Sequence, residues 1–144
     1  MPIIEIFMHR GRTQEEITAI ADAVHDALVE AYQVPREDRF QIVRQCEDYE
    51  LIADPTFMGG PRTNQFLLVR VTAGKSRPRE VKRAFFKSIV DRVGRLGVPK
   101  ADVLTIVDNV TLSDLSLADG EAFDVVLAQQ GIEEWPRPVV PDNV

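Results

Sequence analysis

Pro2 has the most distinctive chemistry in this sequence of 144 residues. An initiator Met is normally removed before a small residue, and its removal would leave Pro2 with a free secondary amine. The reference pKa of an α-amino group is about 7.7–8.0, so modest changes in environment decide whether this amine accepts or donates a proton near neutral pH. If Met1 were retained, the Pro2 nitrogen would be an amide nitrogen and this chemistry would be lost. Many proteins also begin Met-Pro by chance.

Arg77 and Arg79 flank Pro78 at the start of an expected helix and form the second candidate site. Arginine is a poor N-cap, and two cations lie unfavourably at the positive end of a helix dipole. Departures from such local rules often mark functional sites. Two guanidinium groups beside free helix amides would bind a carboxylate or phosphate well. The alternative is a solvated arginine pair beside Glu80.

The other titratable side chains give weaker indications. Asp38 would bind a catalytic water or set the charge of an amine, although a simple turn role also explains it. His9 and His25 have no second metal ligand at a recognised spacing, so we expect both to be structural or exposed, and no metal. Cys46, the only cysteine, lacks the His and Asp context of a nucleophile. There is no Gly-rich phosphate loop or dinucleotide fingerprint, and we expect no cofactor.

The composition excludes several classes of protein. Lys plus Arg number 17 and Asp plus Glu number 23, which gives a net charge of −6. Binding to duplex DNA needs a surplus of Lys and Arg, so no nucleic-acid partner is expected. No apolar run approaches the roughly 20 residues of a membrane helix, and the first residues do not resemble a signal peptide. We expect one domain over residues 1–144, located in the cytoplasm.

The elements that must position these residues form an internal repeat. An ungapped shift aligns residues 2–43 with residues 66–107. Val34-Pro35-x-x-Asp38 then aligns with Val98-Pro99-x-x-Asp102, so the two aspartates have the same local position. Identity between the halves is low, but each has the order strand, helix, turn and strand.

In the first half, the apolar run at 3–8 predicts a strand. Thr13 and Glu16 have the spacing of a capping box, and an apolar stripe follows them at helical spacing. The stripe consists of Ile17, Ile20, Ala21, Val24, Leu28 and Ala31. Val34-Pro35 ends the helix, because the residue before a proline avoids helical geometry, and 39–43 predicts the returning strand.

The second half predicts a strand at 66–72, a helix at 78–95 and a last strand at 103–107, with Gly97-Val98-Pro99 ending the helix. A unit of strand, helix and strand is normally a right-handed crossover that joins parallel strands. Two such units predict an α/β (α+β) fold with a four-stranded sheet and two helices on one face.

The strand at 66–72 also predicts a subunit interface. Phe66-Leu67-Leu68-Val69 is apolar at consecutive positions, so both faces of this strand need burial. Two helices cover only one face of the sheet, and we therefore expect another subunit on the other face. Arg70 is unusual inside this run and would line a site, a sheet edge or a subunit boundary.

The remaining segments have less regular patterns. The connection at 44–65 is long for a simple loop and contains Gly59-Gly60-Pro61, which predicts a turn. The pattern at 108–130 is mixed. The segment 131–144 contains three prolines near Trp135, so we expect an extended tail there, resting on a neighbouring subunit.

Three short motifs on this duplicated unit resemble those of the tautomerase superfamily. They are Pro2, Val-Pro-x-x-Asp-Arg-Phe-Gln at 34–41 and Ser-Arg-Pro-Arg at 76–79. Within the superfamily, the chain looks most like malonate semialdehyde decarboxylase and its fused-repeat relatives, and the resemblance covers roughly residues 2–123. The resemblance implies a homotrimer whose sheets form a central barrel, with an amino-terminal proline in a small pocket.

The resemblance also implies roles for individual residues. In the decarboxylase the proline is protonated and acts as an acid, whereas in the tautomerases it is neutral and acts as a base. Asp38 would support the charge of Pro2 and hold a water. Arg77 and Arg79 would hold the carboxylate of the substrate and polarise its carbonyl group.

An apolar wall of the pocket is implied as well, formed by Leu115, Leu117 and Phe123. The first two stand in Leu-Ser-Leu, where the decarboxylase has Trp-Ser-Phe. The wall is therefore expected to be less bulky and the substrate to differ. The connection at 44–65 is also a few residues longer than in the decarboxylase.

Together these observations predict a cofactor-free enzyme that uses Pro2 to transfer a proton on a small carbonyl carboxylate. The reaction would be keto–enol tautomerisation or decarboxylation of a 3-oxo acid. Two alternatives remain open: hydration or dehalogenation of an acrylic acid in the same pocket, and a catalytically inactive trimeric protein that binds small acids.

Overall fold

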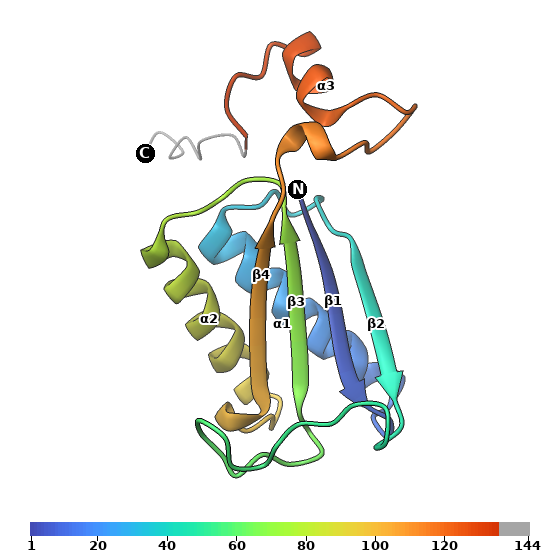
Figure 1. Ribbon diagram of the computed structural model, residues 1–144, viewed down its shortest axis with the longest axis vertical. Coiled ribbons are helices and arrows are strands. Elements are labelled where there is room, and N and C mark those ends of the chain that lie inside the picture. The colour runs from blue at the N-terminus through green and yellow to red at the C-terminus, as the bar shows by residue number, and fades with distance from the viewer. Residues whose placement is uncertain (136–144) are drawn as a thin grey trace.

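Two units of strand, helix and strand share one sheet (Figure 1). The computed structural model describes residues 1–135, so most of the expected tail at 131–144 lies outside the described residues. The first unit consists of β1 (Pro2–His9), α1 (Gln14–Tyr32) and β2 (Gln41–Cys46). The second consists of β3 (Leu67–Ala73), α2 (Arg79–Gly94), the 3-10 turn η1 (Lys100–Asp102) and β4 (Val103–Asn109).

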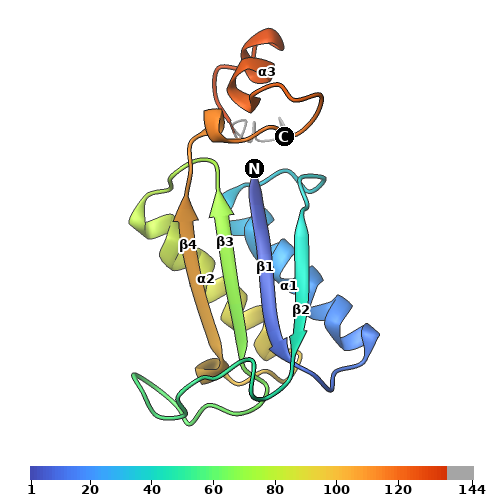
Figure 2. The same cartoon turned by 45° about the vertical axis from the view of Figure 1, so that its right-hand side comes forward.

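The sheet has the strand order β2-β1-β3-β4. Pairing is parallel within each unit, β1 with β2 and β3 with β4, and antiparallel between β1 and β3 in the middle. Both helices lie on the same face of the sheet in both views (Figures 1 and 2). This confirms the predicted four-stranded architecture. Because β1 and β3 are antiparallel, the two units begin at opposite ends of the sheet.

The helix ends follow from local chemistry. The Thr13 side chain accepts a hydrogen bond from the Glu16 backbone N–H at 3.2 Å, as the capping-box spacing predicts. Gln33 then ends α1 in the left-handed conformation, with φ of 56°. The second helix was expected to start at Pro78, but Pro78 has extended backbone (ψ 156°) and acts as the N-cap, so α2 begins at Arg79.

Strand ends are set by the partner strand rather than by the local sequence. The returning strand was expected at 39–43, but the register pairs Ile4 with Gln41 and His9 with Cys46. Since β1 continues to His9, its parallel partner continues to Cys46. For the same reason β4 continues beyond the expected end at 107, because Asn109 pairs with Ala73. His9 is therefore the last residue of β1 rather than part of the following connection.

The core lies between the sheet and the two helices. Its largest fully buried side chains come from β1, β3, α1 and α2, and each contributes roughly 1.5–3 kcal/mol by burial. They are Ile4, Ile6, Met8, Val24, Leu28, Leu67, Val69, Val71, Phe85, Ile89 and Val93.

The other face of the sheet carries a mixture of apolar and charged side chains. Four large apolar side chains are 37–46% exposed on it: Ile3 of β1, Ile42 of β2, and Leu104 and Ile106 of β4. Arg70 also lies on this face and forms an ion pair with Asp108 of β4 at 3.0 Å. The two helices leave this face uncovered, as predicted from the apolar run in β3.

The connection between β2 and β3 is anchored at the end of the sheet where β3 begins. The Thr63 backbone N–H and hydroxyl donate to the two carboxylate oxygens of Asp102 at 2.7 and 2.5 Å. Asp102 is completely buried. This pair anchors the chain just before it enters β3.

After β4 the chain forms a small cap at the end of the sheet where β1 begins. It contains the 3-10 turn η2 (Leu112–Asp114) and the short helix α3 (Phe123–Gln129). Figures 1 and 2 show this segment beyond the strand ends, next to the N-terminus.

No helix within residues 1–135 combines the length and the apolar character that crossing a membrane requires.

Candidate active site

The start of β1 and the end of β3 meet at one end of the sheet. Pro2 is opposite Ala73 in the antiparallel register. The next residue, Gly74, donates its backbone N–H to the Met1 carbonyl oxygen at 3.1 Å. The chain then leads directly to Arg77 and Arg79. The topology thus brings the predicted proline and the predicted arginine pair to the same end of the sheet.

Asp38 reaches this place from the turn after α1. Its backbone N–H donates to the Pro35 carbonyl at 3.0 Å, and His25 Nε2 donates to the nearby Arg36 carbonyl at 2.7 Å. The Asp38 carboxylate lies 3.5 Å from the Met1 amine, and both side chains are under a tenth exposed. Neither carboxylate oxygen has a hydrogen-bond partner among residues 1–135. The carboxylate is therefore buried with an ion pair to the Met1 amine but without a hydrogen bond, so its oxygens are available to accept hydrogen bonds from a ligand.

Arg77 is held in place by the end of α1. Its guanidinium donates to the Lys75 carbonyl at 2.9 Å and to the Tyr32 carbonyl at 3.3 Å. The same group lies over the Tyr32 ring, 5.0 Å from its centroid, and that ring packs on Phe85 with centroids 4.8 Å apart. Tyr32 therefore fixes the orientation of Arg77 with both its backbone and its ring. Sequence reasoning missed Tyr32, whose signal was an aromatic residue just before Val34-Pro35.

Arg79 has a different setting from Arg77. It is the first residue of α2 and is exposed, whereas Arg77 is half-buried. No side chain caps the start of α2. The free amides of the first turn and two guanidinium groups thus lie within one short segment, which suits a carboxylate ligand. His9, His25 and Cys46 are not part of this site, and residues 1–135 contain no cluster of metal-ligating side chains.

Burial controls the charge of the amine and of the carboxylate. The pKa of the Met1 amine is lowered from 8.0, mainly because burial disfavours the charged form, with a smaller contribution from Arg77. Asp38 opposes this shift. The pKa of Asp38 is raised from 3.8, again mainly by burial, although the amine opposes it. Both shifts favour the uncharged forms, so an amine at this place carries a proton less often near neutral pH than an exposed amine does.

An apolar cluster surrounds the Met1 side chain on the cap side. Phe123 and Leu127 of α3 are buried with Met1, and four other side chains pack against them: Leu112, Leu115, Ile132 and Trp135. Phe123 donates its backbone N–H to the Leu115 carbonyl at 2.8 Å and meets the Trp135 ring edge to face. The cluster includes two of the predicted wall residues, Leu115 and Phe123. Leu117 lies outside it and is 44% exposed.

Gly74 lets the cap come this close. A Cβ atom at this position would lie 2.7 Å from Leu115 Cδ1 and 3.0 Å from Leu112 Cδ2, which is closer than packed atoms tolerate. A larger residue would force the Leu112 and Leu115 side chains to shift. Neither Gly74 nor Leu127 and Trp135 were expected from sequence, because only the tertiary fold brings them to the N-terminus.

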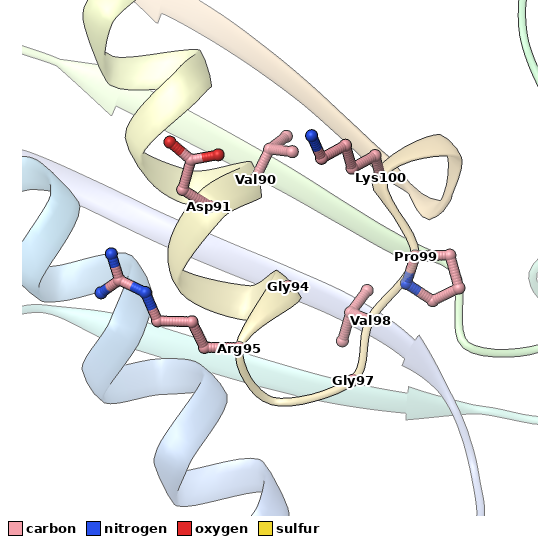
Figure 3. A pocket seen from close by; sticks show the side chains of 8 residues that line it. All are labelled: Val90, Asp91, Gly94, Arg95, Gly97, Val98, Pro99 and Lys100. Carbon is pink, nitrogen blue, oxygen red and sulfur yellow. The ribbon is translucent and has the colours of Figure 1, made fainter.

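A separate pocket of about 560 Å³ lies at the other end of α2 (Figure 3). It contains none of the predicted site residues. Its lining consists of Val90, Asp91, Gly94, Arg95, Gly97, Val98, Pro99 and Lys100.

Comparison with known proteins gives matches over most of the chain. Residues 2–59 and residues 38–118 match two family models, both described as tautomerase enzyme. The probable tautomerases YusQ and YrdN of Bacillus subtilis (strain 168) are 32% and 34% identical to the chain. Each match covers 85% of this chain, and it covers 97% of YusQ and 95% of YrdN.

Solved structures agree with these matches. A malonate semialdehyde decarboxylase, described with its decarboxylase and hydratase activities, superposes with a TM-score of 0.82 at 29% identity, over 86% of this chain and 96% of that one. FG41 malonate semialdehyde decarboxylase inhibited by 3-bromopropiolate gives a TM-score of 0.81 at 33% identity, over 86% and 95%. A fused 4-OT symmetric trimer shares the fold, with a TM-score of 0.73 at 21% identity over 86% and 98%.

Proposed function

Since this chain belongs to the tautomerase family, we propose that Pro2, freed by removal of Met1, is the proton-transfer group of a cofactor-free reaction on a small carbonyl carboxylate. Its tautomerase-named relatives identify the chain as an enzyme of the tautomerase type, which disfavours the inactive binding protein. The observation that carries the proposal is the buried Asp38 carboxylate, which pairs with the Met1 amine at the end of the sheet where the segment with Arg77 and Arg79 begins.

Removal of Met1 would free two groups beside the Pro2 nitrogen. One is the Asp38 carboxylate, which now faces the Met1 amine at 3.5 Å. The other is the Gly74 N–H, which now donates to the Met1 carbonyl at 3.1 Å. The mature site would then offer an amine, an anion to balance its charge and a backbone donor for an oxygen that becomes negative during the reaction.

The proposed reaction is a keto–enol tautomerisation. Arg77 and Arg79 bind the carboxylate. Pro2 takes a proton from the carbon next to the carbonyl, and the C–H electron pair forms the C=C bond while the carbonyl pair moves to oxygen. The enolate oxygen is stabilised by nearby donors, and the proton on Pro2 is then returned to that oxygen, directly or through water. Burial lowers the pKa of the Met1 amine, and we expect burial to act on the Pro2 amine in the same way, which supports the role of Pro2 as a base.

Decarboxylation of a 3-oxo acid is the second candidate. It is favoured by the similarity to two malonate semialdehyde decarboxylases at 29% and 33% identity. In that reaction the C–C bond to the carboxylate breaks, its electron pair enters the enolate, and CO₂ leaves. A protonated Pro2 then gives its proton to the carbon. Hydration of an acrylic acid would use the same groups, with Asp38 orienting water.

We also propose that three copies assemble through the uncovered face of the sheet. Ile3, Ile42, Leu104 and Ile106 give this face an apolar character that water disfavours. The fused 4-OT that shares the fold is described as a symmetric trimer.

The decisive experiment is Pro2→Ala, measured on phenylenolpyruvate, 2-hydroxymuconate and malonate semialdehyde. Intact mass must first establish that Met1 is removed. We expect the variant to lose at least about a hundredfold in turnover, as removal of a proton-transfer group typically does. Pro99→Ala, a proline change at the far end of the sheet, is the matched control. Unchanged activity in Pro2→Ala would overturn the proposal.

A further inference from the structure

The Met1 side chain fills an apolar space beside the candidate site. It is 4% exposed and packs against Phe123 and Leu127 of α3. Four partly buried side chains pack against this cluster: Leu112, Leu115, Ile132 and Trp135. If Met1 is removed, as the proposed function requires, this space loses its occupant but keeps its walls.

The emptied space is suited to an apolar group rather than to water. On the cap side its walls are apolar side chains, and apolar cavities stay dry and take up apolar ligands. The walls are also tied to one another. The Phe123 N–H donates to the Leu115 carbonyl at 2.8 Å, and the Phe123 and Trp135 rings meet at 85° with centroids 5.5 Å apart. These contacts oppose collapse of the space after Met1 leaves.

The space is connected directly to the reacting nitrogen. The Met1 carbonyl carbon is bonded to the Pro2 nitrogen, and its oxygen accepts from Gly74 at 3.1 Å. Met1 therefore shows how a carbonyl compound fits: its oxygen on the Gly74 N–H, its carbon beside Pro2, and its side chain among the apolar residues.

Further room exists behind the same walls. A pocket of about 560 Å³ lies on the outer side of the cap, and it shares Leu112, Leu127, Ile132 and Trp135 with the cluster. A shift of these side chains would extend the space for a longer group.

We propose that the substrate is a carbonyl carboxylate with an unbranched apolar or aromatic substituent at least as large as a methionine side chain, bound where Met1 now lies. The inference rests on the proposed function and specifies its substrate class. It predicts that unsubstituted three-carbon acids are poor substrates.

The test is a series of 2-oxo acids that differ in the substituent: pyruvate, 2-oxobutanoate, 2-oxohexanoate, 4-methylthio-2-oxobutanoate and phenylpyruvate. Exchange of the C3 protons for deuterium is followed by NMR with the processed protein. We expect kcat/KM to rise about fourfold for each additional buried methylene. Leu127→Ala widens the space and should move the optimum to a larger substituent. Val125→Ala, on the exposed side of the same helix, is the control and should keep the wild-type order.

A second measurement separates this inference from the proposed function. The affinities of butanoate, hexanoate and octanoate are measured by calorimetry, which needs no turnover. An affinity that rises with chain length supports the apolar site, even if none of the 2-oxo acids exchanges its C3 protons. A lack of exchange would then count against the proposed function and not against the apolar site. Exchange that is fastest with pyruvate, or affinity that is independent of chain length, overturns the inference.

Discussion

Asp38 and Asp102 have equivalent positions in the two repeats but opposite environments. Asp102 is fully buried, and both of its oxygens accept hydrogen bonds from Thr63 at the end of the sheet where β3 begins. Asp38 is at the other end, where β1 begins, and neither of its oxygens has a hydrogen-bond partner among residues 1–135. The same turn thus anchors the chain in one unit and leaves a carboxylate available in the other.

Replacing Asp38 by Asn should stabilise the fold while reducing activity. The pKa of Asp38 is raised by burial, so the folded chain holds this proton more tightly than the unfolded chain does. Ionisation of Asp38 therefore destabilises the fold as the pH rises through its folded pKa. We expect Asp38→Asn to have a higher melting temperature than wild type at pH 7, a difference that disappears below about pH 3, where Asp38 is protonated in both states. Thermal melts across this range measure it.

Glu37→Gln is the control for this change, because Glu37 is the exposed neighbour of Asp38. Its melting temperature should change much less than that of Asp38→Asn, because the charge of Glu37 is only the smallest cause of the raised Asp38 pKa. A lower melting temperature for Asp38→Asn at pH 7 would show that the carboxylate contributes more by pairing than its burial costs.

The amine of Pro2 should titrate below the ordinary range. Burial lowers the pKa of the Met1 amine from 8.0, despite the opposing effect of Asp38, and we expect burial to act on the Pro2 amine in the same way. We expect the ¹⁵N chemical shift of labelled Pro2 to titrate with a midpoint below about 7.7, and kcat/KM for tautomerisation to rise with pH through the same midpoint. A midpoint above about 8 would make the amine cationic at neutral pH and favour decarboxylation instead.

Tyr32 should act through Arg77. The ring lies 5.0 Å from the guanidinium carbon, and a cation–π contact of this kind contributes roughly 0.5–2 kcal/mol. We expect Tyr32→Leu to raise KM for a carboxylate substrate by about 2- to 30-fold with a smaller change in kcat. Tyr32→Phe keeps the ring and removes only a hydroxyl that has no partner among residues 1–135, so it should restore the wild-type KM. Equal KM values in Tyr32→Leu and wild type would contradict this role.

A charge on the uncovered sheet face should separate the subunits. Ile106 is 46% exposed on β4 beside the Arg70–Asp108 pair, and it would be buried between copies. We expect Ile106→Lys to weaken the trimer by at least about tenfold in sedimentation, because an unpaired charge is costly to bury. Leu96→Lys is the matched control, since Leu96 is 47% exposed after α2, on the helix side of the molecule. A wild-type chain that sediments as a monomer at micromolar concentration would refute the trimer.

The main elements could be predicted from sequence because their signals are local. Thr13 and Glu16 mark the start of α1 wherever the helix packs, and the apolar run in β3 shows that both faces of that strand need burial. Strand ends were less accurate, because pairing with β1 extends β2 to Cys46. Register is a property of two strands, and the sequence of one strand alone does not contain it.

Some residues of the candidate site could be predicted from local sequence features, and others could not. Pro2, Asp38 and the arginines were found because each is unusual for its local position or matches a motif. Tyr32 and Gly74 act through contacts with segments that are distant in sequence. Tyr32 contacts Arg77, and Gly74 contacts the cap. Hydrophobic residues such as Leu127 have no local feature that distinguishes a pocket wall from the core.

The antiparallel arrangement of the two units has a further consequence for the number of reactive ends. A polypeptide has a single amino terminus however many repeats it contains, so fusion of two units leaves one of the two equivalent sheet ends without an amine. Thr63 now bonds to Asp102 at that end. A chain divided between Gln65 and Phe66 would gain a second terminus there. The link between the repeats thus leaves one terminal amine per sheet instead of two. At the end without an amine, Thr63 and Asp102 hold the chain in place.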